Sequence, residues 1–576
     1  MRTLSIWWCI LLASSSVPLL SNEVVEYPFM FLHRESGSFT PSFEVQDSSN
    51  AAADSVSAVR TITPHDSAIV ESSQRVFAVS RVHGVLSVDT SLRAMAITKR
   101  DIQTFYYTSL NDILDATTAT YPLSLGYHGQ PHARRTLGGG ARDFAVEFNG
   151  RSLTDVATGL TNLNLYSPED FENVEIYTGT AAIVMADNSS GALVNIQEPV
   201  HDVKGPFTRL WYADGANNYY ASDGFLSQNI APNTNLTLGF KRQAGDGRFD
   251  NQWLDAWNVR GRVRWTPNAR TTLSLSEIFS NHGTGLNGGV DTSGSVNIND
   301  EVNASVRLPD YNERVYRHDL TASASLHLAD SSLSLLQGSA YFSHADWNLS
   351  RGTELFALGD SSRQVRRISS AYGLTVRWEH DISNDVRLLS GIDYELRQAE
   401  RTLYNIRVDE TRAAVFALAT WHPSSWVTVR GGMRGLNRGD WYSNSSGLTI
   451  DARLHEQWNL ILDLSQSERL PSAVEDASPE QTILGYARLR YASHDVHGEL
   501  CGYVRQTRDL LLSRIDYSYD SIAPLLSTTI NIPEQQVRGL YAKAAWTMFE
   551  AFYGDVLIQS AWTSRGSTTV SLLPSV

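Results

Sequence analysis

The most constraining feature of this chain is an alternation of apolar and polar residues that begins after Pro206 and continues to the last residues. Strict alternation places apolar side chains on one face of a β-strand and polar side chains on the other. Alternating segments of about ten residues, separated by turn residues, are typical of barrels whose outer face meets lipid and whose lumen is wet. Soluble β-sandwiches and propellers alternate too, but no repeat of fixed period supports a propeller. Clear examples lie at residues 236–240, 272–276, 320–328 and 426–430.

Aromatic residues cluster near the ends of these alternating segments. Girdles of aromatic side chains at the two interfaces of a bilayer produce this distribution in membrane barrels. The residues concerned are Trp211, Tyr212, Tyr219, Tyr220, Trp257, Trp265, Trp421, Trp426, Trp546, Phe549, Phe552 and Tyr553. From Phe207 onward we count roughly seventeen alternating segments.

The N-terminal residues predict export. Arg2 precedes an apolar run at residues 6–12 and small residues at 13–16. This pattern predicts a secretory signal peptide over residues 1–21. Residues 22–74 are rich in Ser, Ala, Asp and Glu without sustained periodicity, so we expect a flexible periplasmic extension there.

Charge and cysteine content narrow the remaining classes of protein. The formal net charge of -15 argues against nucleic acid or an anionic membrane surface as a partner. Past the leader no run of about eighteen apolar residues occurs, so we expect no membrane-spanning helix. Cys9 lies in the leader, which leaves Cys501 without an internal disulfide partner. A closed ladder of strands would hold such an exported chain together.

Residues 75–205 predict a compact mixed α/β domain. Asp101 and Ser109 are predicted helix N-caps, because each precedes apolar positions at helical spacing. Short apolar runs that end at turn residues predict strands. The predicted strands are 144–148, 174–177 and 193–196.

Five motifs follow one another in this domain, and their order and spacing resemble the plug domain of TonB-dependent outer-membrane receptors. The motifs are Ala96-Ile-Thr-Lys-Arg-Asp-Ile, Ser109-Leu-Asn-Asp-Ile-Leu, Glu147-Phe-Asn-Gly-Arg-Ser-Leu, Asn173-Val-Glu-Ile-Tyr-Thr-Gly and Ser190-Gly-Ala-Leu-Val-Asn-Ile. Later segments at 467–472, 478–480, 502–510 and 535–540 resemble barrel signatures of the same family. The resemblance implies a membrane all-β barrel of antiparallel strands over residues 206–576, with the mixed α/β plug domain of residues 75–205 in its lumen.

The resemblance breaks at two motif positions that carry arginine in the family. An Ile-Arg-Gly triplet is replaced here by Thr136-Leu137-Gly138, and a Glu-Val-Leu-Arg-Gly-Pro run by Glu175-Ile-Tyr-Thr-Gly-Thr180. In the family these arginines are thought to bond with barrel carboxylates, and neither Leu nor Thr replaces a charge-assisted bond. Two interpretations stay open: the receptor is divergent or decaying, or nearby arginines compensate. The candidates for compensation are Arg134, Arg135 and Arg142.

The number of strands also departs from the family, whose barrels have twenty-two. An incomplete barrel would expose unpaired amides to lipid at a cost of several kcal/mol each. Either the barrel closes with fewer strands or the chain is a truncated product, and we favour truncation or divergence.

Two plug loops are candidates for ligand binding. The first carries Tyr127, His128, His132, Arg134 and Arg135, a set that suits an anionic or metal-chelate ligand. The second offers the amides of Asn162 and Asn164. A solvated polar loop is the alternative in each case.

The segment before the plug is a candidate TonB box, the strand through which the family contacts its energy transducer. Val76, Phe77, Ala78 and Val79 alternate as strand addition to a sheet edge requires. A first plug strand or a tether would give the same pattern. Farther along, residues 282–300 predict a long extracellular loop whose oxygen donors Asp291, Asn297, Asn299 and Asp300 also suit ordinary solvation.

No motif predicts an enzyme. The chain has neither a nucleophile elbow nor a His-Glu-x-x-His zinc site, and Gly138-Gly-Gly140 lacks the residues of a phosphate loop. We therefore expect an enzymatically inactive, monomeric receptor in the outer membrane of a Gram-negative bacterium, without cofactor or bound metal. The resemblance implies uptake of a ferric siderophore, cobalamin or oligosaccharide, with energy from a TonB-type transducer. The alternatives are a non-transporting structural or adhesive barrel with a static plug, and a soluble exported β-protein that binds carbohydrate.

Overall fold

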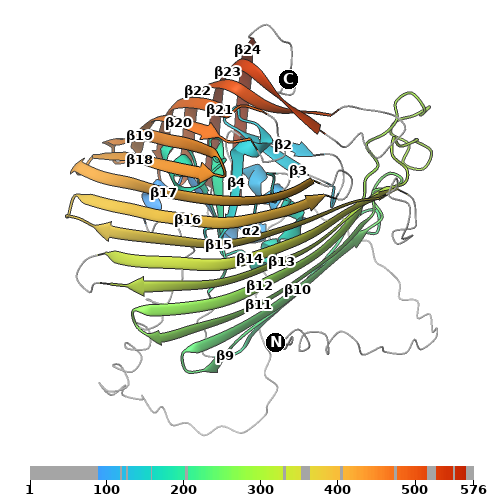
Figure 1. The fold of residues 1–576 in the computed structure, drawn as a ribbon, viewed down its shortest axis with the longest axis horizontal. Coiled ribbons are helices and arrows are strands. Elements are labelled where there is room, and N and C mark those ends of the chain that lie inside the picture. Colours follow the sequence, from blue (N-terminus) through green and yellow to red (C-terminus); the bar gives the residue numbers. More distant parts are fainter. Residues whose placement is uncertain are drawn as a thin grey trace. The chain divides into compact units, whose positions relative to one another are not determined.

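The structure is a computed structural model of the 576-residue chain, and Figure 1 shows its fold. The predicted signal peptide, the extension and the TonB-box candidate Val76–Val79 lie outside the described residues. The described ranges are 89–104, 106–116, 120–124, 128–130, 132–156, 159–200, 205–328, 333–351, 364–401, 406–471, 477–515, 527–548 and 552–565.

Residues 89–200 form a small mixed α/β unit, which we call the inner domain. Its main sheet has the order β1-β6-β7-β4-β5, and a separate hairpin pairs β2 with β3. Strands β4 and β7 are parallel, and the other pairs of the main sheet are antiparallel. The elements are η2 (Thr90–Leu92), β1 (Met95–Thr98), α2 (Lys99–Thr104), α3 (Leu110–Ile113), η3 (Leu114–Ala116), β2 (Thr120–Ser124), β3 (His132–Thr136), η4 (Ala141–Asp143), β4 (Phe144–Phe148), β5 (Arg151–Ser152), η5 (Leu163–Leu165), η6 (Pro168–Asp170), β6 (Asn173–Tyr177), α4 (Gly179–Met185) and β7 (Ala192–Gln197).

Within the described ranges, seventeen further strands form a closed barrel, which we call the wall. They are β8 (Phe207–Asp214), β9 (Tyr220–Ala231), β10 (Thr234–Gly245), β11 (Leu254–Asn268), β12 (Thr271–Gly285), β13 (Tyr311–His327), β14 (Ser334–Arg351), β15 (Gln364–Asp381), β16 (Val386–Arg401), β17 (Ile406–Ser424), β18 (Val427–Arg438), β19 (Trp441–His455), β20 (Trp458–Arg469), β21 (Glu480–Ala492), β22 (Val496–Ile515), β23 (Ser527–Met548) and β24 (Phe552–Arg565).

The strands predicted for the inner domain are confirmed as β4, β6 and β7. Asn149 and Gly150, with φ of 50° and 75°, form the tight turn between β4 and β5, where two positive φ angles favour Asn-Gly. Ser109 is the N-cap of α3, as predicted. The prediction for Asp101 is wrong: α2 begins earlier, and the Asp101 carboxylate accepts hydrogen bonds from the backbone and hydroxyl of Thr98.

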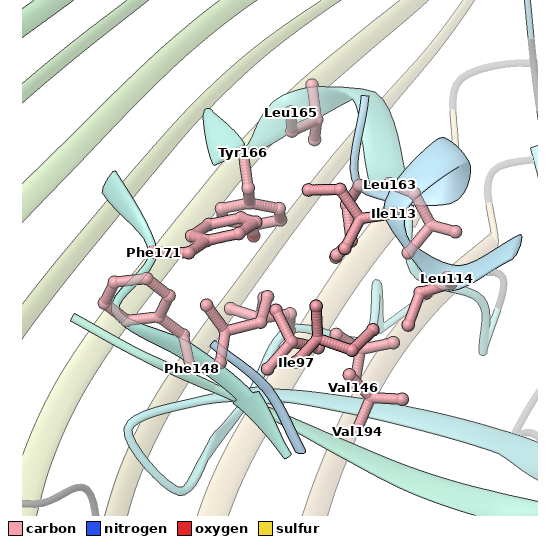
Figure 2. Packing of buried hydrophobic residues seen from close by; sticks show 14 of the residues in the cluster. Ile97, Ile113, Leu114, Val146, Phe148, Leu163, Leu165, Tyr166, Phe171 and Val194 are labelled. Atoms are coloured by element: carbon pink, nitrogen blue, oxygen red, sulfur yellow. The ribbon is translucent and has the colours of Figure 1, made fainter. Parts of the chain in front are cut away.

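The inner domain has an apolar core of its own (Figure 2). Ile97 of β1, Val146 of β4 and Val194 of β7 cover one face of the main sheet, and Ile113 and Leu163 close over them. Each of these side chains is almost fully buried. Since burial of one large aliphatic side chain is worth about 1.5–3 kcal/mol, this cluster stabilises the domain without help from a disulfide.

The alternation predicted for the wall appears in its side-chain directions. In β11 the outward positions are Trp257, Val259, Val263 and Trp265, which are exposed on the outer face. The alternate positions Asn258, Arg260, Arg262 and Arg264 are buried towards the lumen. Of the aromatic residues predicted to form a girdle, Tyr212, Tyr220, Trp257, Trp265, Trp421 and Trp426 are exposed, whereas Tyr219 is buried.

The odd number of strands determines how the wall closes. Every sequential pair from β8 to β24 is antiparallel, so these two strands run in the same direction. They are neighbours in the closed barrel, and their pairing is therefore parallel. Of the two alternatives left open by the sequence, the described strands form the closed barrel with fewer strands.

The two ends of the wall differ in the length of their connections. Short turns at 232–233, 269–270, 425–426 and 456–457 lie at one end. Longer loops at 246–253 and 286–310 lie at the other, together with a short turn at 439–440. Because outer-membrane barrels keep short turns on the periplasmic side, the loop end is the extracellular end. No helix in the described ranges is long and apolar enough to cross a bilayer.

Candidate functional site

The inner domain lies in the lumen of the wall, because its hydrogen bonds reach strands all around the ring. Arg209 of β8 donates to the carbonyl of Glu169 at 2.8 Å, and Gln559 of β24 donates to the carbonyl of Thr120 at 2.9 Å. Between these strands, Ser280 of β12 donates to the carbonyl of Leu165 at 2.5 Å. The interface between the inner domain and the wall is therefore the part of the molecule where passage is blocked.

Carboxylates of the inner domain pair with basic side chains of the wall around this interface. The Lys241 ammonium lies 2.8 and 2.9 Å from the two carboxylate oxygens of Glu169. Arg262 lies 2.9 Å from the Glu198 carboxylate. Further pairs of the same polarity are Asp143–Arg505, Asp155–Arg367, Asp170–Arg260, Asp187–Arg412 and Asp187–Arg434.

Asp187 has the densest set of partners. It follows α4, which packs against β17, β18, β19 and β20. Its two oxygens accept separately, one from Arg412 and the other from Arg434 Nε at 2.5 Å. Arg412 also contacts Glu395 at 2.9 Å, and Arg434 contacts Asp393 at 2.7 Å. Burial alone would raise the pKa of Asp187, but Arg412 and Arg434 hold it well below its usual range.

Asp143 forms a second buried cluster. Arg505 lies 2.9 Å and Arg469 lies 3.6 Å from its two carboxylate oxygens. Arg469 also pairs with Glu480 at 2.6 Å. Burial would raise the pKa of Asp143, but Arg505 and Arg469 lower it, so the carboxylate stays charged in the lumen.

The two positions that lack the family's arginine explain this polarity. Leu137 packs in an apolar cluster with Tyr503 and Val537 of the wall. Thr178 receives a hydrogen bond at 3.3 Å from Arg488 of the wall, so the guanidinium there comes from the opposite side of the interface. Arg134, one of the three candidates for compensation, pairs with Asp115 within the inner domain.

Arg151 of the inner domain provides the opposite polarity. Its guanidinium lies 2.8 Å from Asp319 of β13, which also accepts from Arg317 and from Tyr166. Arg151 further lies over the ring of Tyr341 at 5.4 Å. Arg151 lies in the motif that begins at Glu147, but the motif does not predict its partner, because Asp319 lies far away along the chain.

Glu147 is the buried carboxyl of the inner domain whose environment differs most from that of Asp187. Burial raises its pKa to about 8, despite nearby Arg377. One of its oxygens has no hydrogen-bond partner among the described residues. Two clefts border Asp187 nearby, and Glu147 lines one of them together with Arg412.

The first predicted ligand loop lies at the extracellular end. The ring of His128 contacts that of Tyr219 in a tilted arrangement, with centroids 4.5 Å apart and an interplanar angle of 43°, while Tyr127 lies outside the described residues. Gln130 donates at 2.9 Å to the hydroxyl of Thr284, near the loop end of β12. Burial lowers the pKa of His128 and of His132, so both imidazoles are neutral at physiological pH.

Arg134, Asn162 and Asn164 have structural partners. Arg134 is buried and donates to Asn111 and Asp115 within the inner domain. Asn162 caps η5, and Asn164 donates to the carbonyls of Gly129 and Gln130. Arg135 follows Arg134 in β3, opposite Tyr121, and burial lowers its pKa. The Asn164 amide thus holds the turn between His128 and His132, whereas Arg134 pairs with Asn111 and Asp115.

Two further sequence predictions change. Residues 282–285 belong to β12 rather than to a loop, and His282 faces the lumen. The oxygen donors of the loop are used locally: Asp291 accepts from the backbone of Ser293, and Asp300 accepts from the backbone of Asn303. Among the described residues no group of three or more His, Cys, Asp or Glu is arranged to hold a metal.

Comparisons with known proteins agree with this architecture. Residues 87–193 match the family model of the TonB-dependent receptor plug domain. No curated protein matches the chain in sequence.

Solved structures show the same fold. The copper transporter OprC has 14% sequence identity and a TM-score of 0.66, with 84% of this chain and 80% of that chain covered. The siderophore receptor PirA from Pseudomonas aeruginosa has 12% identity and a TM-score of 0.66, with 82% and 85% covered. The ferric yersiniabactin uptake receptor FyuA from Yersinia pestis has 13% identity and a TM-score of 0.66, with 84% and 81% covered.

The inner domain is therefore a TonB-dependent receptor plug domain, and the wall has the fold of the barrels of such receptors. The predictions of family resemblance and of fold class are confirmed. The outer-membrane location stays a prediction that these similarities support. The similar proteins are receptors and transporters rather than enzymes.

Proposed function

We propose that this chain, whose inner domain matches the plug family of TonB-dependent receptors, imports a metal ion or metal chelate with energy supplied through TonB. The observation that carries the proposal is the filled lumen, with hydrogen bonds from the inner domain to strands from β8 to β24. A ligand crosses such a barrel only if the inner domain moves. Because that movement breaks many buried contacts, it requires an external source of energy.

The extracellular end supplies the first contact with ligand. His128, His132 and the turn held by Asn164 lie there, between the inner domain and the strands β11 and β12. Imidazole nitrogens bind transition metals, and the solved structures with the same fold include a copper transporter and siderophore receptors. These observations favour a metal or a metal chelate over cobalamin or an oligosaccharide.

The order of the main sheet suggests how force would act on the inner domain. Strand β1 is an edge strand and pairs only with β6 in the sheet order β1-β6-β7-β4-β5. Force applied to the chain before β1 would therefore separate β1 from β6 first. The apolar core behind β6 and β7 would be exposed only in a later step.

The energy requirement is tested by ligand uptake in cells. Uptake of radioactive iron or copper from a defined medium is compared in cells with and without TonB, and in a variant that lacks residues 75–80. We expect uptake to fall to background in both cases. Undiminished uptake by the deletion variant at equal abundance in the outer membrane rules out energy transfer through this segment.

The second candidate function is a structural or adhesive barrel whose inner domain never moves. The number of contacts at Asp143 and Asp187 is the observation behind it, because these carboxylates join the inner domain to several strands of the wall, although each intact pair adds little net free energy. A reversible cross-link separates the two functions. A Cβ added to Gly447 of β19 would lie 3.0 Å from the Cβ of Thr180, close enough for a disulfide after a small shift.

Thr180→Cys together with Gly447→Cys would tether α4 to the wall under oxidising conditions. We expect the oxidised receptor to lose uptake and the reduced receptor to regain it, with each single variant as control. Uptake that persists in the fully oxidised protein means that this part of the inner domain stays in place. A static barrel would show the same low uptake in both redox states.

A further inference from the structure

The six residues before β1, residues 89–94, form a short ordered segment that we call the strap. Asp89 caps its turn η2, and the Asp89 carboxylate accepts hydrogen bonds from the backbone and the hydroxyl of Ser91 at 2.9 and 2.6 Å. At the other end of the strap, the Ala94 amide donates to the carbonyl of Ile176 in β6 at 2.7 Å. Any pull on the chain that precedes Asp89 therefore passes through the strap before it reaches β1.

Two arginines of the wall bind the strap from different strands. The Arg430 guanidinium of β18 donates to the hydroxyl of Ser91 at 2.8 Å. The Arg490 guanidinium of β21 donates to the carbonyl of Ala94. Both arginines lie near the periplasmic ends of their strands. The strap is thus attached to two separate strands of the wall at its periplasmic end.

The strap is held at two further points. The Leu92 side chain is buried in an apolar cluster that includes Leu389 of β16 and Leu418 of β17. The Arg93 guanidinium lies 2.8 Å from the carboxylate of Glu175, which belongs to β6, the strand that pairs with β1. The strap therefore joins the wall to the pairing partner of β1.

Both wall arginines keep a charged partner when the strap leaves. Arg430 lies 3.4 Å from Asp451, and Arg490 lies 2.9 Å from Glu499. These carboxylates belong to the wall. On the strap the acceptors are a neutral hydroxyl and a neutral carbonyl, so separation leaves neither guanidinium without its carboxylate. The ion pairs of Asp187 differ, because their separation takes one charge away from another. The contacts of the strap can therefore open and close at lower cost.

We propose that the strap is a latch: Arg430 and Arg490 hold it against the wall, and its release precedes the separation of β1 from β6. The inference rests on the proposed function in one respect, since it assumes that force enters through the chain before Asp89. While the strap is in place, its attachments to the wall carry that force, and the four-residue strand β1 is shielded from it. The latch keeps the inner domain closed under a weak pull and lets it open under a strong one.

Hydrogen exchange of the full detergent-solubilised chain tests the latch without ligand or TonB. The double variant carries Arg430→Met and Arg490→Met, which keep the length of the side chains and remove the donors. We expect amides of the strap and of β1 to exchange about tenfold faster than in the wild type, because a hydrogen bond from a charged group opposes local opening by about this factor. Amides of β4 and β7 should keep their rates. Arg453→Met is the matched control, because Arg453 is exposed near the periplasmic end of β19, between the two strands concerned.

Ser91→Ala keeps the proposal falsifiable if the double variant folds poorly. This substitution removes the acceptor of Arg430 from the strap and leaves the wall unchanged. Exchange should again become faster in the strap, by a smaller factor than in the double variant. Unchanged exchange in the strap overturns the latch. An equal increase across β4, β6 and β7 also overturns it, because the arginines would then support the whole inner domain.

Force and uptake measurements separate failure of the latch from failure of the proposed function. With the wall held fixed and force applied to the chain before Asp89, the wild type should show a first rupture that the double variant lacks. The same first rupture in both proteins overturns the latch. In cells, the double variant should take up radioactive iron or copper at a lower abundance of TonB than the wild type needs.

Faster strap exchange in a receptor that takes up neither metal supports the latch and counts against the proposed function. TonB-dependent uptake together with unchanged strap exchange counts against the latch alone.

Discussion

The interior of the inner domain is apolar, whereas its boundary with the wall is rich in charged residues. The interior is an apolar cluster that includes Ile113, Val146 and Val194 (Figure 2). The boundary is a set of buried ion pairs such as Asp187–Arg412 and Asp143–Arg505. An apolar core is lost when a domain unfolds, whereas charged groups regain favourable hydration when they separate into water. The difference indicates a domain that can leave its position without losing its fold.

The energetics of buried ion pairs support this view. Taking two charges out of water costs nearly as much as their attraction returns, so an intact pair contributes little net free energy. Removing one partner is costly because the other charge stays buried. The ion pairs therefore add little free energy that opposes separation of the whole domain from the wall. Substitution of a single paired residue is nevertheless costly.

Loss of Asp187 should have the largest effect. Asp187→Ala leaves Arg412 and Arg434 buried without their shared carboxylate. We expect a destabilisation of about 3–5 kcal/mol. Hydrogen exchange of α4 amides and thermal unfolding of the solubilised protein would both report it.

A compensated variant sharpens the same comparison. Replacing Asp187, Arg412 and Arg434 together by Leu, Met and Met removes the three charges that meet at Asp187. Glu395 stays paired with Arg397, and Asp393 stays paired with Arg377. This variant should recover most of the lost stability, because apolar replacement of a whole buried ion cluster is often neutral or stabilising. If it is no more stable than Asp187→Ala, the cost does not come from the stranded charges.

Truncation of the core should have the next largest effect. Leu110 is fully buried in α3, and Leu110→Ala creates a cavity that costs about 2–5 kcal/mol. We expect hydrogen exchange to increase in β4, β6 and β7 while the wall strands keep their protection. Equal loss of protection in the wall would mean that the inner domain does not fold as a separate unit.

The two buried carboxyls should respond oppositely to pH. Burial raises the pKa of Glu147 to about 8. The free energy of unfolding is therefore highest below the ordinary pKa of a glutamate and falls as the pH rises through about 8. Burial opposes ionisation of Asp187 as well, but its arginines lower the pKa, so its contribution is present above the ordinary value and lost on acidification.

Glu147→Gln tests this difference. We expect the variant to lose the fall in stability between pH 6 and about 9, which is on the order of 2 kcal/mol in the wild type. The acid limb from Asp187 should be unchanged. Unfolding temperatures across this pH range decide the matter, and an alkaline limb that persists in Glu147→Gln would assign it to another group.

The sequence predicted the elements that depend on local patterns. Alternation located the wall strands, because a side-chain period of two is visible in any single segment. The Asn149-Gly150 turn was equally visible, since two positive φ angles require such residues. The start of α2 was missed by a few residues because Thr98 and Asp101 both have the chemistry of a cap.

The interface was less predictable because its partners are set by the register of distant strands. Thr178 meets Arg488, and Asp187 meets Arg434, across hundreds of residues of sequence. The polarity reversal was signalled only by the two missing motif arginines. His282 was assigned to a loop because the glycines after it resemble a turn, although they belong to a strand near its end.

Loss of an exposed ion pair should have the smallest effect on stability. It shows whether the effects of the other substitutions come from burial of the charge or from pairing alone. Arg407 and Asp409 of β17 lie 2.9 Å apart, much as Arg505 and Asp143 do, but their side chains are 70% and 52% exposed. Water screens such a pair and rehydrates the remaining partner, so Arg407→Ala should change stability by less than about 0.5 kcal/mol. Thermal unfolding beside Asp187→Ala makes the comparison direct. A loss at Arg407 as large as that at Asp187 would mean that pairing itself, rather than the stranding of a buried charge, holds the inner domain in the wall.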